Sequence, residues 1–559
     1  MAGGDRTRRI GVIGAGISGL LTCKYLLQKG FAPIVFESEG DIGGVWRKTI
    51  QTTKLQTPKS LYQFSDFPWP PSVADPFPTQ KQVLQYLHSY AHFHGLLPRV
   101  HLNSRVLSLT YHGSQEEEDE WNWCKPFGNG GEWRITVQNT QTLSTEVHRV
   151  EFVVVCAGMY SGSPNIPEFS KAKGEEGPEV FQGKVMHSME YSAMDHAAAA
   201  NLVKGKSVAV VGLQKSGMDI AMECSSANGP DSKQPCILLY RTPHWNVPDH
   251  LPWGLPLAYL YQTRFSELLL HKPAQGLLLS LLATFFLPLV CSPLSTFSHT
   301  CFIHTLICEA ASAAAVLYQR WAVSKFVESH IKRKLKLTKH GMVPKHSFLQ
   351  EINSCSIATV PEGFYDRVEE GSIILKKSQN FSFVREGVMI DDSDDNNDEP
   401  ETLKIDLLIL ATGFRFVDKL KALFISSPFQ SLIDKDTTLM LYRQCIHPRI
   451  PQLAFIGFSE SIANLFTSEM QCRWLAELLD GTFNLPSIEE MEENTRRWDK
   501  YYREKSLGEY HHHHGNRSCL GAVQIWFNDQ LCKDMGWKPL RKKGLLKELF
   551  QPYGPMDYA

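Results

Sequence analysis

The stretch Ile10-Gly11-Val12-Ile13-Gly14-Ala15-Gly16-Ile17-Ser18-Gly19 decides the fold of this chain of 559 residues. Residues 10–13 form a short apolar run, which is typical of a buried parallel strand. The glycines lead into a helical pattern over 20–29, and Pro33–Phe36 predicts a second strand that ends at Glu37. This order of strand, glycine turn, helix, strand and acid is the dinucleotide-binding fingerprint.

Four residues of this first turn have separate predicted roles. Gly14 permits the tight turn, Gly16 lets the backbone approach a pyrophosphate, and Gly19 lets the helix pack on the strand. The positive N-terminal end of the helix then faces the phosphates. Glu37 can accept hydrogen bonds from ribose hydroxyls. The alternative is a chance glycine-rich loop.

A second turn of the same kind follows the apolar run Val208–Val211 and has the sequence Gly212-Leu213-Gln214-Lys215-Ser216-Gly217. Gln214 stands where the first turn has Gly16, so its side chain should move a pyrophosphate outward by the width of a Cβ. Lys215 could offset the looser approach, because an ammonium group can pair with a phosphate. The candidate contacts of this turn are Gly212, Lys215, Ser216 and Gly217.

Arg241 follows the next predicted strand, Ile237–Tyr240. NAD-specific folds keep an acid at this place, so an arginine indicates a clamp for the 2′-phosphate of NADPH and a preference over NADH. The alternative is a surface arginine in a turn before Pro243.

The composition limits the class of protein. The chain has 57 basic and 59 acidic residues, which leaves no electrostatic footprint for nucleic acid. Its length predicts two or three domains. The 13 cysteines lack a C-x-x-C pair. This argues against a disulfide framework, a zinc module or a dithiol flavin reductase, and suits a reducing compartment. No metal site is predicted, and the polar start, residues 1–10, does not fit a signal peptide.

Between the two turns lies Phe181-Gln182-Gly183-Lys184-Val185-Met186-His187-Ser188-Met189-Glu190-Tyr191, or F-x-G-x-x-x-H-x-x-x-Y. Two dinucleotide turns around this string resemble the flavin-containing monooxygenases, and most closely the plant N-hydroxylating (pipecolate N-hydroxylase-like) subgroup. The resemblance implies FAD at the first turn and NADPH at the second. It also implies O2 and a small amine or amino acid as substrates, N-hydroxylation through a C4a-hydroperoxide of the flavin, and a context of plant defence.

The same resemblance implies an α/β fold with two Rossmann-like domains, the NADPH domain inserted into a discontinuous FAD domain. The apolar runs 152–158 and 407–414 are both expected to return the chain to the FAD domain. The first segment of the FAD domain is expected to cover 1–175 and its second segment 346–480. The NADPH domain is expected to cover 176–345, and a helical extension 481–559.

Further cofactor contacts are implied by the family's motifs. They are Gly44 and Trp46, in the element Gly43–Arg47, and Thr412 and Gly413, in an A-T-G-F element. The block Ser65–Pro70 matches a family motif whose prolines and aromatics fit a rigid wall beside the flavin ring.

Gln56 and His187 are the candidate catalytic residues. Gln56 aligns with an asparagine of the animal enzymes that is thought to hydrogen-bond the flavin peroxide, and the alternative is a surface loop glutamine. His187 is expected to hold the connector between the domains in one geometry rather than to act as an acid or base. Phe181 and Tyr191 are expected to pack against one domain each, and Tyr191 favours oxygenation of a heteroatom over ester formation.

An apolar insert is expected within 274–319. Residues 274–308 contain no Lys, Arg, Asp or Glu, but Pro288 and Pro293 interrupt the run, so a clean membrane span is not predicted. Residues 290–319 look inserted relative to the plant enzymes. Three interpretations stay open: peripheral membrane contact or a substrate-channel hairpin through 274–308, a lid over the NADPH domain, or translated sequence that splicing normally removes.

Several functional alternatives stay open as well. They are S-oxygenation, an uncoupled NADPH oxidase that yields H2O2, and a catalytically silent nucleotide-binding relative, the last motivated by Gln214, Gln56 and the insert. A cytoplasmic location is expected, with association with the endoplasmic reticulum membrane as the alternative. The sequence does not predict the oligomeric state.

Overall fold

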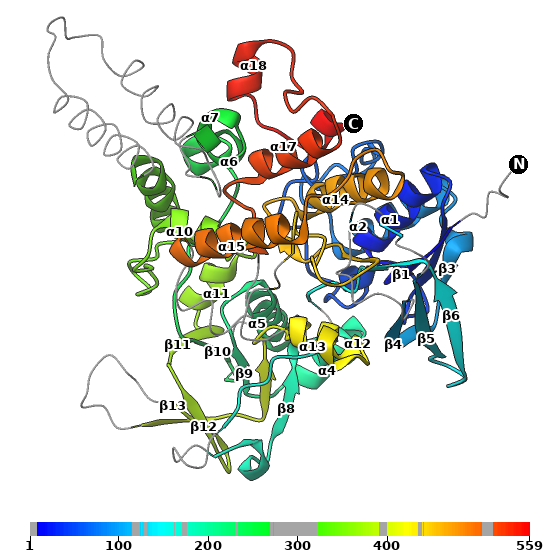
Figure 1. Cartoon of the computed structure of the whole chain (residues 1–559). Helices are drawn as coiled ribbons and strands as arrows, with labels where there is room; N and C mark the ends of the chain where they lie inside the picture. The colour runs from blue at the N-terminus through cyan, green and yellow to red at the C-terminus, as the bar shows by residue number, and fades with distance from the viewer. Residues whose placement is uncertain are drawn as a thin grey trace, which may run out of the picture.

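The computed structural model contains two α/β domains and a C-terminal extension (Figure 1). The apolar insert expected within 274–319, and with it the expected membrane contact, lies outside the described residues. No helix in the described ranges combines the length and apolar character that a bilayer crossing needs. The structure describes residues 8–113, 123, 126–127, 131–160, 162–169, 176–229, 233–268, 272, 321–390, 400–433, 439, 441–505 and 518–559.

A parallel five-stranded sheet forms the centre of the first domain, with strand order β16-β7-β1-β2-β3. Its elements are β1 (Arg9–Ile13), α1 (Ile17–Gln28), β2 (Ala32–Phe36), β3 (Val100–His101), β7 (Phe152–Val155) and β16 (Leu453–Phe455). Ile10 and Val12 lie in one buried cluster, whereas Ile13 and Val155 lie in another. Both faces are therefore covered, which explains why these strands are continuous apolar runs.

The second domain repeats this layout, with strand order β8-β15-β9-β10-β11, and all of its strands are parallel. Its elements are β8 (Lys184–His187), β9 (Val208–Val211), α5 (Lys215–Asn228), β10 (Cys236–Tyr240), β11 (Ile373–Lys377) and β15 (Leu407–Leu410). The strand β9 thus corresponds to β1, β10 to β2, β11 to β3 and β15 to β7. Only the fifth strands differ. In the second sheet the fifth strand, β8, comes before the other four in the chain, whereas in the first sheet the fifth strand, β16, comes long after the other four.

Each domain carries a three-stranded antiparallel sheet at the same point of this order. In the first domain it consists of β4 (Ser104–His112), β5 (Glu132–Asn139) and β6 (Thr145–Val150), between β3 and β7. In the second it consists of β12 (Phe381–Val384), β13 (Gly387–Ile390) and β14 (Glu401–Lys404), between β11 and β15. The two domains are therefore topological repeats.

The expected return of the chain to the first domain at residues 407–410 is wrong. This segment is β15, which pairs with β9 and β8 at the centre of the second sheet. The chain rejoins the first sheet only at β16, which pairs with β7. The boundary expected at residue 346 is therefore too early, since β11 to β15 all belong to the second domain.

Helices cover the sheets and join them to the C-terminal extension. Helix α14 packs on α1, and α17 packs on α14 (Figure 1). The helices not yet given are α2 (Gln80–Phe93), α3 (Ser188–Ser192), α4 (His196–Val203), α6 (Leu257–Tyr261), α7 (Arg264–Leu268), helical residues 321–334, α10 (Phe348–Asn353), α11 (Phe364–Glu369), α12 (Phe416–Leu423), α13 (Ser427–Leu432), α14 (Asn464–Leu479), α15 (Ile488–Lys505), α17 (Gln524–Asp534) and α18 (Leu545–Phe550).

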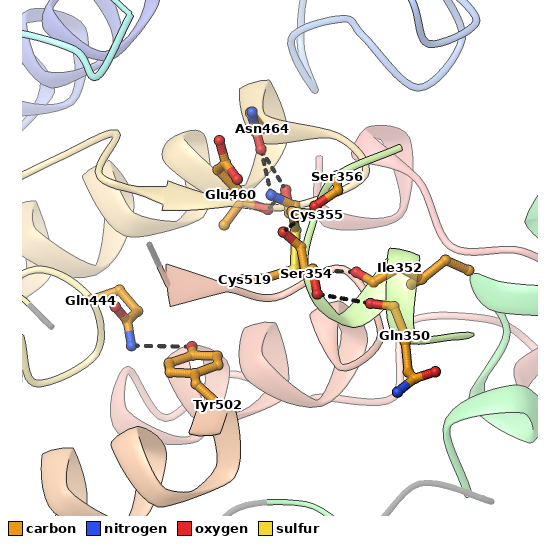
Figure 2. The surroundings of a disulfide bond; sticks show 12 residues. Gln350, Ile352, Ser354, Cys355, Ser356, Gln444, Glu460, Asn464, Tyr502 and Cys519 are labelled. Carbon is orange, nitrogen blue, oxygen red and sulfur yellow. Dashed lines mark hydrogen bonds between the residues drawn. A yellow bond between two sulfur atoms is a disulfide. The ribbon is translucent and has the colours of Figure 1, made fainter. Parts of the chain in front are cut away.

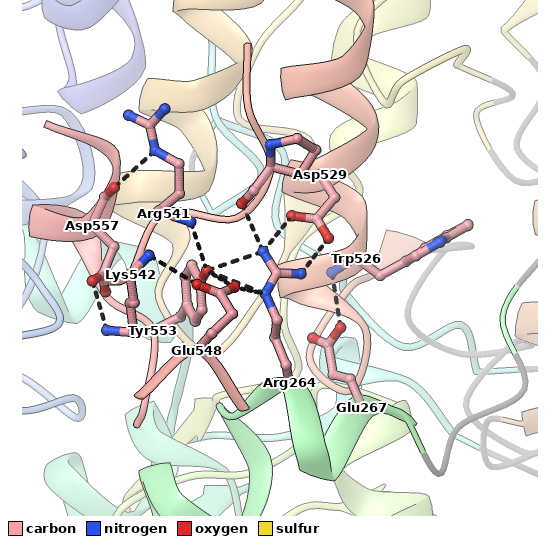
Figure 3. Close-up of polar contacts among 10 residues, drawn as sticks. Arg264, Glu267, Trp526, Asp529, Arg541, Lys542, Glu548, Tyr553 and Asp557 are labelled. Atoms are coloured by element: carbon pink, nitrogen blue, oxygen red, sulfur yellow. Dashed lines mark hydrogen bonds and ion pairs between the residues drawn. The ribbon is translucent and has the colours of Figure 1, made fainter. Parts of the chain in front are cut away.

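A partly buried arginine fastens the second domain to the extension. Arg264 of α7 donates to both carboxylate oxygens of Asp529, at 2.5 and 2.9 Å, and also contacts Glu548 and the Tyr553 hydroxyl (Figure 3). Glu267, one turn later, accepts the first backbone N–H groups of α17. A carboxylate at a helix N-terminus stabilises the helix through its dipole. The extension is therefore docked by polar contacts as well as by apolar packing.

A disulfide adds a covalent link between the second domain and the extension. Cys355, just after α10, is bonded to Cys519 of β18 (Ser518–Cys519), 164 residues away (Figure 2). Strand β18 pairs with β17 (Ser459–Glu460), which follows β16 of the first domain. The scattered cysteine pattern, which argues against a disulfide framework, did not predict this single bond. The described free cysteines are all buried.

We predict that Cys519→Ser lowers the free energy of unfolding by about 2 to 4 kcal/mol, because the bond closes a long loop in the unfolded chain. Denaturant unfolding without reductant measures the change. Adding a thiol reductant to the wild type should give the same loss. The double variant with Cys355→Ser should lose no more than the single variant, and additive losses would contradict the pairing.

Candidate dinucleotide sites

The first glycine turn brings helix α1 into direct contact with strand β1. The Gly14 N–H donates to the Phe36 carbonyl at the end of β2, at 2.8 Å, and its φ is +102°. A Cβ on Gly14 would lie 2.6 Å from the Cys156 carbonyl oxygen, and one on Gly19 would overlap the Gly14 carbonyl. These contacts exclude any side chain, so both glycines are required by geometry.

The N-terminus of α1 is open to an anion. Gly16 is its N-cap, no side chain caps it, and its first turn contains no acidic residue. The Gly43–Gly44 turn lies against it, because the Gly43 N–H donates to the Ala15 carbonyl at 3.1 Å. A Cβ on Gly16 would lie 3.4 Å from the Gly44 Cα. This backbone cradle fits a pyrophosphate, which binds to helix N–H groups and needs close approach.

Glu37 fastens the same turn from the end of β2. Its side chain is buried, Oε2 accepts the Ala15 N–H at 2.7 Å, and Oε1 accepts the Glu39 N–H at 3.0 Å. An ionised carboxylate has about four acceptor positions, so capacity remains for a ribose hydroxyl. Trp46, nearby, donates from its indole to the Tyr62 hydroxyl at 2.8 Å.

The second turn repeats the first in detail. The Gly212 N–H donates to the Leu239 carbonyl at 2.9 Å, and its φ is +119°. A Cβ on Gly212 would lie 2.5 Å from the Ala411 carbonyl oxygen, and one on Gly217 would overlap the Gly212 carbonyl. Gly212 and Gly217 therefore correspond to Gly14 and Gly19 of the first turn.

Gln214 and Lys215 distinguish the second turn from the first. Gln214 is the N-cap of α5 with φ −96°, a backbone conformation that any residue can adopt, and Ser216 is exposed in the first turn. The Lys215 ammonium pairs with Asp219 at 2.6 Å. Lys215 was expected to compensate for the Gln214 side chain by binding a phosphate. To do so, its ammonium group would have to leave Asp219.

Asp219 also links the two domains. Its Oδ2 accepts the Thr53 hydroxyl at 2.7 Å, and Thr52 donates to Glu223 of the same helix at 2.6 Å. Residues 50–56 of the first domain therefore lie along α5. Neither Thr53 nor Asp219 was selected from the sequence, because no motif contains them.

Gln56 lies on this interdomain segment. Its backbone carbonyl accepts from the His250 ring at 2.7 Å and from the Thr359 hydroxyl, and its side-chain oxygen accepts the Thr359 N–H at 3.1 Å. These contacts place Gln56 between the domains and argue against a free surface loop. They also occupy its side-chain oxygen.

Thr412 and Gly413 form a crossing between the two domains. The Gly413 carbonyl accepts the Asn165 N–H at 2.9 Å, Asn165 Nδ2 donates to the Thr412 carbonyl at 3.0 Å, and the Arg415 N–H donates to Ser163. The segment after β7 thus pairs with the segment after β15. Thr412 and Gly413 therefore lie in a connector between the domains, at the edge of the second cradle.

The interpretation of Phe181–Tyr191 as a bridge that packs against both domains is wrong. Phe181 lies in a cluster on one face of the second sheet and Tyr191 in the cluster on the other. His187 ends β8 and caps α3, because its Nδ1 accepts the Met189 N–H at 3.1 Å. Burial lowers the pKa of His187, opposed by a hydrogen bond to the Gly413 carbonyl. The capping contact fits the structural role expected for this residue.

The block Ser65–Pro70 is held in place by side-chain contacts. The buried Glu469 accepts the Ser65 N–H and hydroxyl at 3.0 and 2.7 Å, and Trp69 stacks on Tyr86 with ring centroids 4.0 Å apart. The carboxylate also accepts the Tyr25 hydroxyl at 2.6 Å. This network joins α1, the wall and α14.

Two residues at the first cradle were missed from the sequence. Gly457, with φ +87°, follows β16, and a Cβ there would clash with the Ser18 hydroxyl at the start of α1. Lys419 donates to the Ala157 carbonyl at 2.8 Å, and burial lowers its pKa to about 8. A glycine after an apolar strand was the available signal for Gly457. Nothing local marks Lys419.

Arg241 is exposed at the carboxyl end of β10, beside the second turn. Its carbonyl accepts from Gln379 at 3.4 Å. In a parallel sheet this edge is where dinucleotides bind. The position therefore fits the expected 2′-phosphate contact.

A family model described as flavin-binding monooxygenase-like matches residues 7–283 and 309–541. The chain belongs to this family. The family binds flavin, and steroid monooxygenase, a solved structure of the same fold at 16% identity, holds NADP. The family match passes over residues 284–308, within the stretch expected to carry the insert.

Full-length relatives agree with this assignment. "Probable flavin-containing monooxygenase 1" of Arabidopsis thaliana is 38% identical over 557 residues, covering 98% of this chain and 96% of that protein. A second Arabidopsis flavin-containing monooxygenase, number 2, is 35% identical over 537 residues, covering 95% and 98%.

Solved structures show the same fold. Cyclohexanone monooxygenase with bound epsilon-caprolactone has a TM-score of 0.61 at 15% identity and covers 95% of this chain and 99% of its own. S-allyl-L-cysteine S-oxygenase from Allium sativum has a TM-score of 0.55 at 16% identity and covers 95% and 89%.

We predict that Gly19→Ala and Gly217→Ala act on different cofactors. Each methyl group would overlap a carbonyl of its own turn and cost about 1 to 3 kcal/mol locally. Gly19→Ala should weaken FAD retention about 10-fold or more. Gly217→Ala should raise the KM for NADPH by a similar factor while FAD stays bound, so the two variants control for each other. Equal loss of both cofactors in both variants would contradict separate sites.

Gln214→Gly should lower the KM for NADPH about 3- to 10-fold, because it removes the side chain at the cradle. Glycine at an N-cap costs only a few tenths of a kcal/mol, so stability should barely change. Steady-state kinetics with varied NADPH measures the effect, and FAD affinity should stay constant. An unchanged KM would show that Gln214 does not face the pyrophosphate.

Proposed function

We propose that this family member is an NADPH- and O2-dependent monooxygenase that N-hydroxylates a small amine or amino acid. The observation that carries the proposal is the repeat of two open dinucleotide cradles, each at the carboxyl edge of its own parallel sheet. Such edges are where α/β sheets bind nucleotides. We also propose a context of plant defence, and similarity to two Arabidopsis proteins supports only the plant part of it.

The residues that would hold FAD belong to the first cradle. Backbone groups at Gly14, Gly16 and Gly44 would take the pyrophosphate and Glu37 the ribose, while Trp46 would border the same cradle. When bound, FAD supplies the oxygen chemistry, and the protein positions and protects it.

The residues that would hold NADPH belong to the second cradle. Gly212, Ser216 and Gly217 stand at the N-terminus of α5, and Arg241 would bind the 2′-phosphate. Thr412 and Gly413 border this cradle through Ala411, so we propose that they set the distance between the two nucleotide sites.

The chain's own contribution to the reaction is positioning and exclusion of water. Ser65 and Trp69 of the wall are buried against the first domain, and the segment 50–56 places Gln56 between the domains. A dry site limits loss of the oxidant to H2O2. The protein needs no general base, because an amine that reacts must arrive unprotonated, and the buried His187 ring is already committed to capping α3.

The proposal is tested with the FAD-loaded protein, NADPH and 18O2, against a panel of amines, amino acids and sulfides. One labelled oxygen atom on nitrogen, found by mass spectrometry, is the expected result. A labelled sulfoxide would favour the alternative S-oxygenase, and the fold shared with the Allium enzyme is the observation behind that alternative. H2O2 alone would indicate an uncoupled oxidase. A protein that binds FAD but consumes no NADPH would be a silent relative.

Arg241→Ala should raise the KM for NADPH about 10-fold or more and leave that for NADH unchanged, because a charge-assisted contact to phosphate is worth about 1.5 to 3 kcal/mol. The ratio of the two kcat/KM values measures the preference. Arg367→Ala is the control, since this arginine of α11 pairs with Glu370. Equal effects on both coenzymes would contradict a 2′-phosphate clamp.

A further inference from the structure

A compact cluster of two histidines and a glutamate lies in the second domain, apart from both cradles. His244 Nδ1 is 2.9 Å from Glu351 Oε1, and His346 Nε2 is in contact with Glu351 Oε2. The three potential ligand atoms all lie within 4.8 Å of one another. More than 100 residues separate His244 from Glu351, so the fold brings the cluster together.

Glu351 is fully buried, the two histidines are partly buried, and all three are held in place. The Glu351 side chain is 0% exposed and each imidazole 11% exposed. The Trp245 backbone N–H donates to Glu351 Oε2 at 3.0 Å, and the Trp245 indole donates to the His346 carbonyl at 2.6 Å. Outer contacts of this kind fix the orientation of metal ligands in known sites.

Secondary structure fixes the two segments that carry the cluster. Ser347 caps α10 through a capping box with Gln350, which places His346 just before the helix and Glu351 inside it. Val247, three residues after His244, bridges to Thr359 on the chain beyond the same helix. The ligand atoms are therefore preorganised on rigid elements.

The donor set selects the type of ion. Two imidazole nitrogens with one carboxylate oxygen are a ligand set of zinc proteins, which complete it with water. Magnesium and calcium prefer sets made of oxygen alone. The ring nitrogens that approach Glu351 are the atoms that would ligate, so the ion would replace their hydrogen bonds to Glu351, and each ring would carry its proton on the other nitrogen.

Access to the cluster comes from a cavity of about 860 Å³ lined in part by Trp245, His346, Gln350 and Asn353. Asn353 Oδ1 is buried there without a hydrogen-bond partner. A cavity with an unsatisfied acceptor suits bound water. His346 is the cluster member that lines this cavity, and the cavity provides a route for an ion to reach the cluster.

We propose that His244, His346 and Glu351 bind one divalent transition-metal ion of the zinc type, with water as a further ligand. The ion would tie α10 to the segment after β10. That segment also carries His250, whose ring contacts Gln56, and α10 leads to Cys355 of the disulfide. The site would thus stabilise the side of the second domain that meets the first domain and the extension.

The experiment uses the full chain loaded with FAD, stripped with a chelator and titrated with Zn²⁺ by calorimetry. The four adjacent histidines His511–His514, which lie outside the described residues, are replaced by serine so that they cannot bind the ion. One ion per chain is expected. Co²⁺ in place of Zn²⁺ should give a visible ligand-field spectrum, a readout that does not depend on turnover.

His244→Gln and His346→Gln should each weaken Zn²⁺ binding about 100-fold or more, since each removes a direct ligand. His340→Gln is the matched control, because His340 lies in the same domain beside Glu369, 3.7 Å away. Thermal unfolding without metal checks that each variant folds. The proposal is overturned if the serine-replaced protein binds no Zn²⁺ and shows no Co²⁺ spectrum, or if folded His346→Gln and His244→Gln bind as tightly as the His340→Gln control.

Discussion

The structure depends on one steric constraint, the approach of a helix to a strand without room for a Cβ. In each domain the first glycine of the turn adopts a positive φ against a carbonyl of the neighbouring strand, and the last glycine rests on the carbonyl of the first. Only glycine satisfies these contacts. They hold the N-terminus of α1 and α5 at the edge of a sheet, where its N–H groups and dipole can receive a phosphate.

This constraint is used twice, and the rest of the fold connects the two copies. The order of strand, helix, strand and inserted antiparallel sheet is the same in both domains. The connectors after β7 and β15 cross at Asn165 and Gly413, and residues 50–56 reach from the first domain along α5. Two anchors, Arg264 and the Cys355–Cys519 bond, then fix the C-terminal extension across the assembly. Because of these links, many residues far from the two nucleotide sites help to fix where the sites lie relative to each other.

The sequence could predict both turns because everything that defines them is local. It also led to the prediction of two domains with one discontinuous, but the segment taken as the return, 407–410, belongs to the second sheet, and β16 makes the return. The sheet to which residues 407–410 belong could not be predicted, because a buried apolar run has the same pattern in either sheet. The Cys355–Cys519 pair had no local signal, and the short apolar run of β16 was not selected. The roles of Phe181 and Tyr191 were misjudged for a related reason: a motif fixes residue types, but not the domain that buries them. His244, His346 and Glu351 escaped notice because their spacing matches no metal motif.

The central claim is that the two cradles act together, with NADPH at one delivering electrons to FAD at the other. Anaerobic mixing of the FAD-loaded protein with NADPH, followed through the visible absorbance of oxidised flavin, tests it most directly. We expect complete loss of that absorbance at a rate that saturates with NADPH and is faster than with NADH. Flavin that stays oxidised in a protein with both nucleotides bound would contradict it.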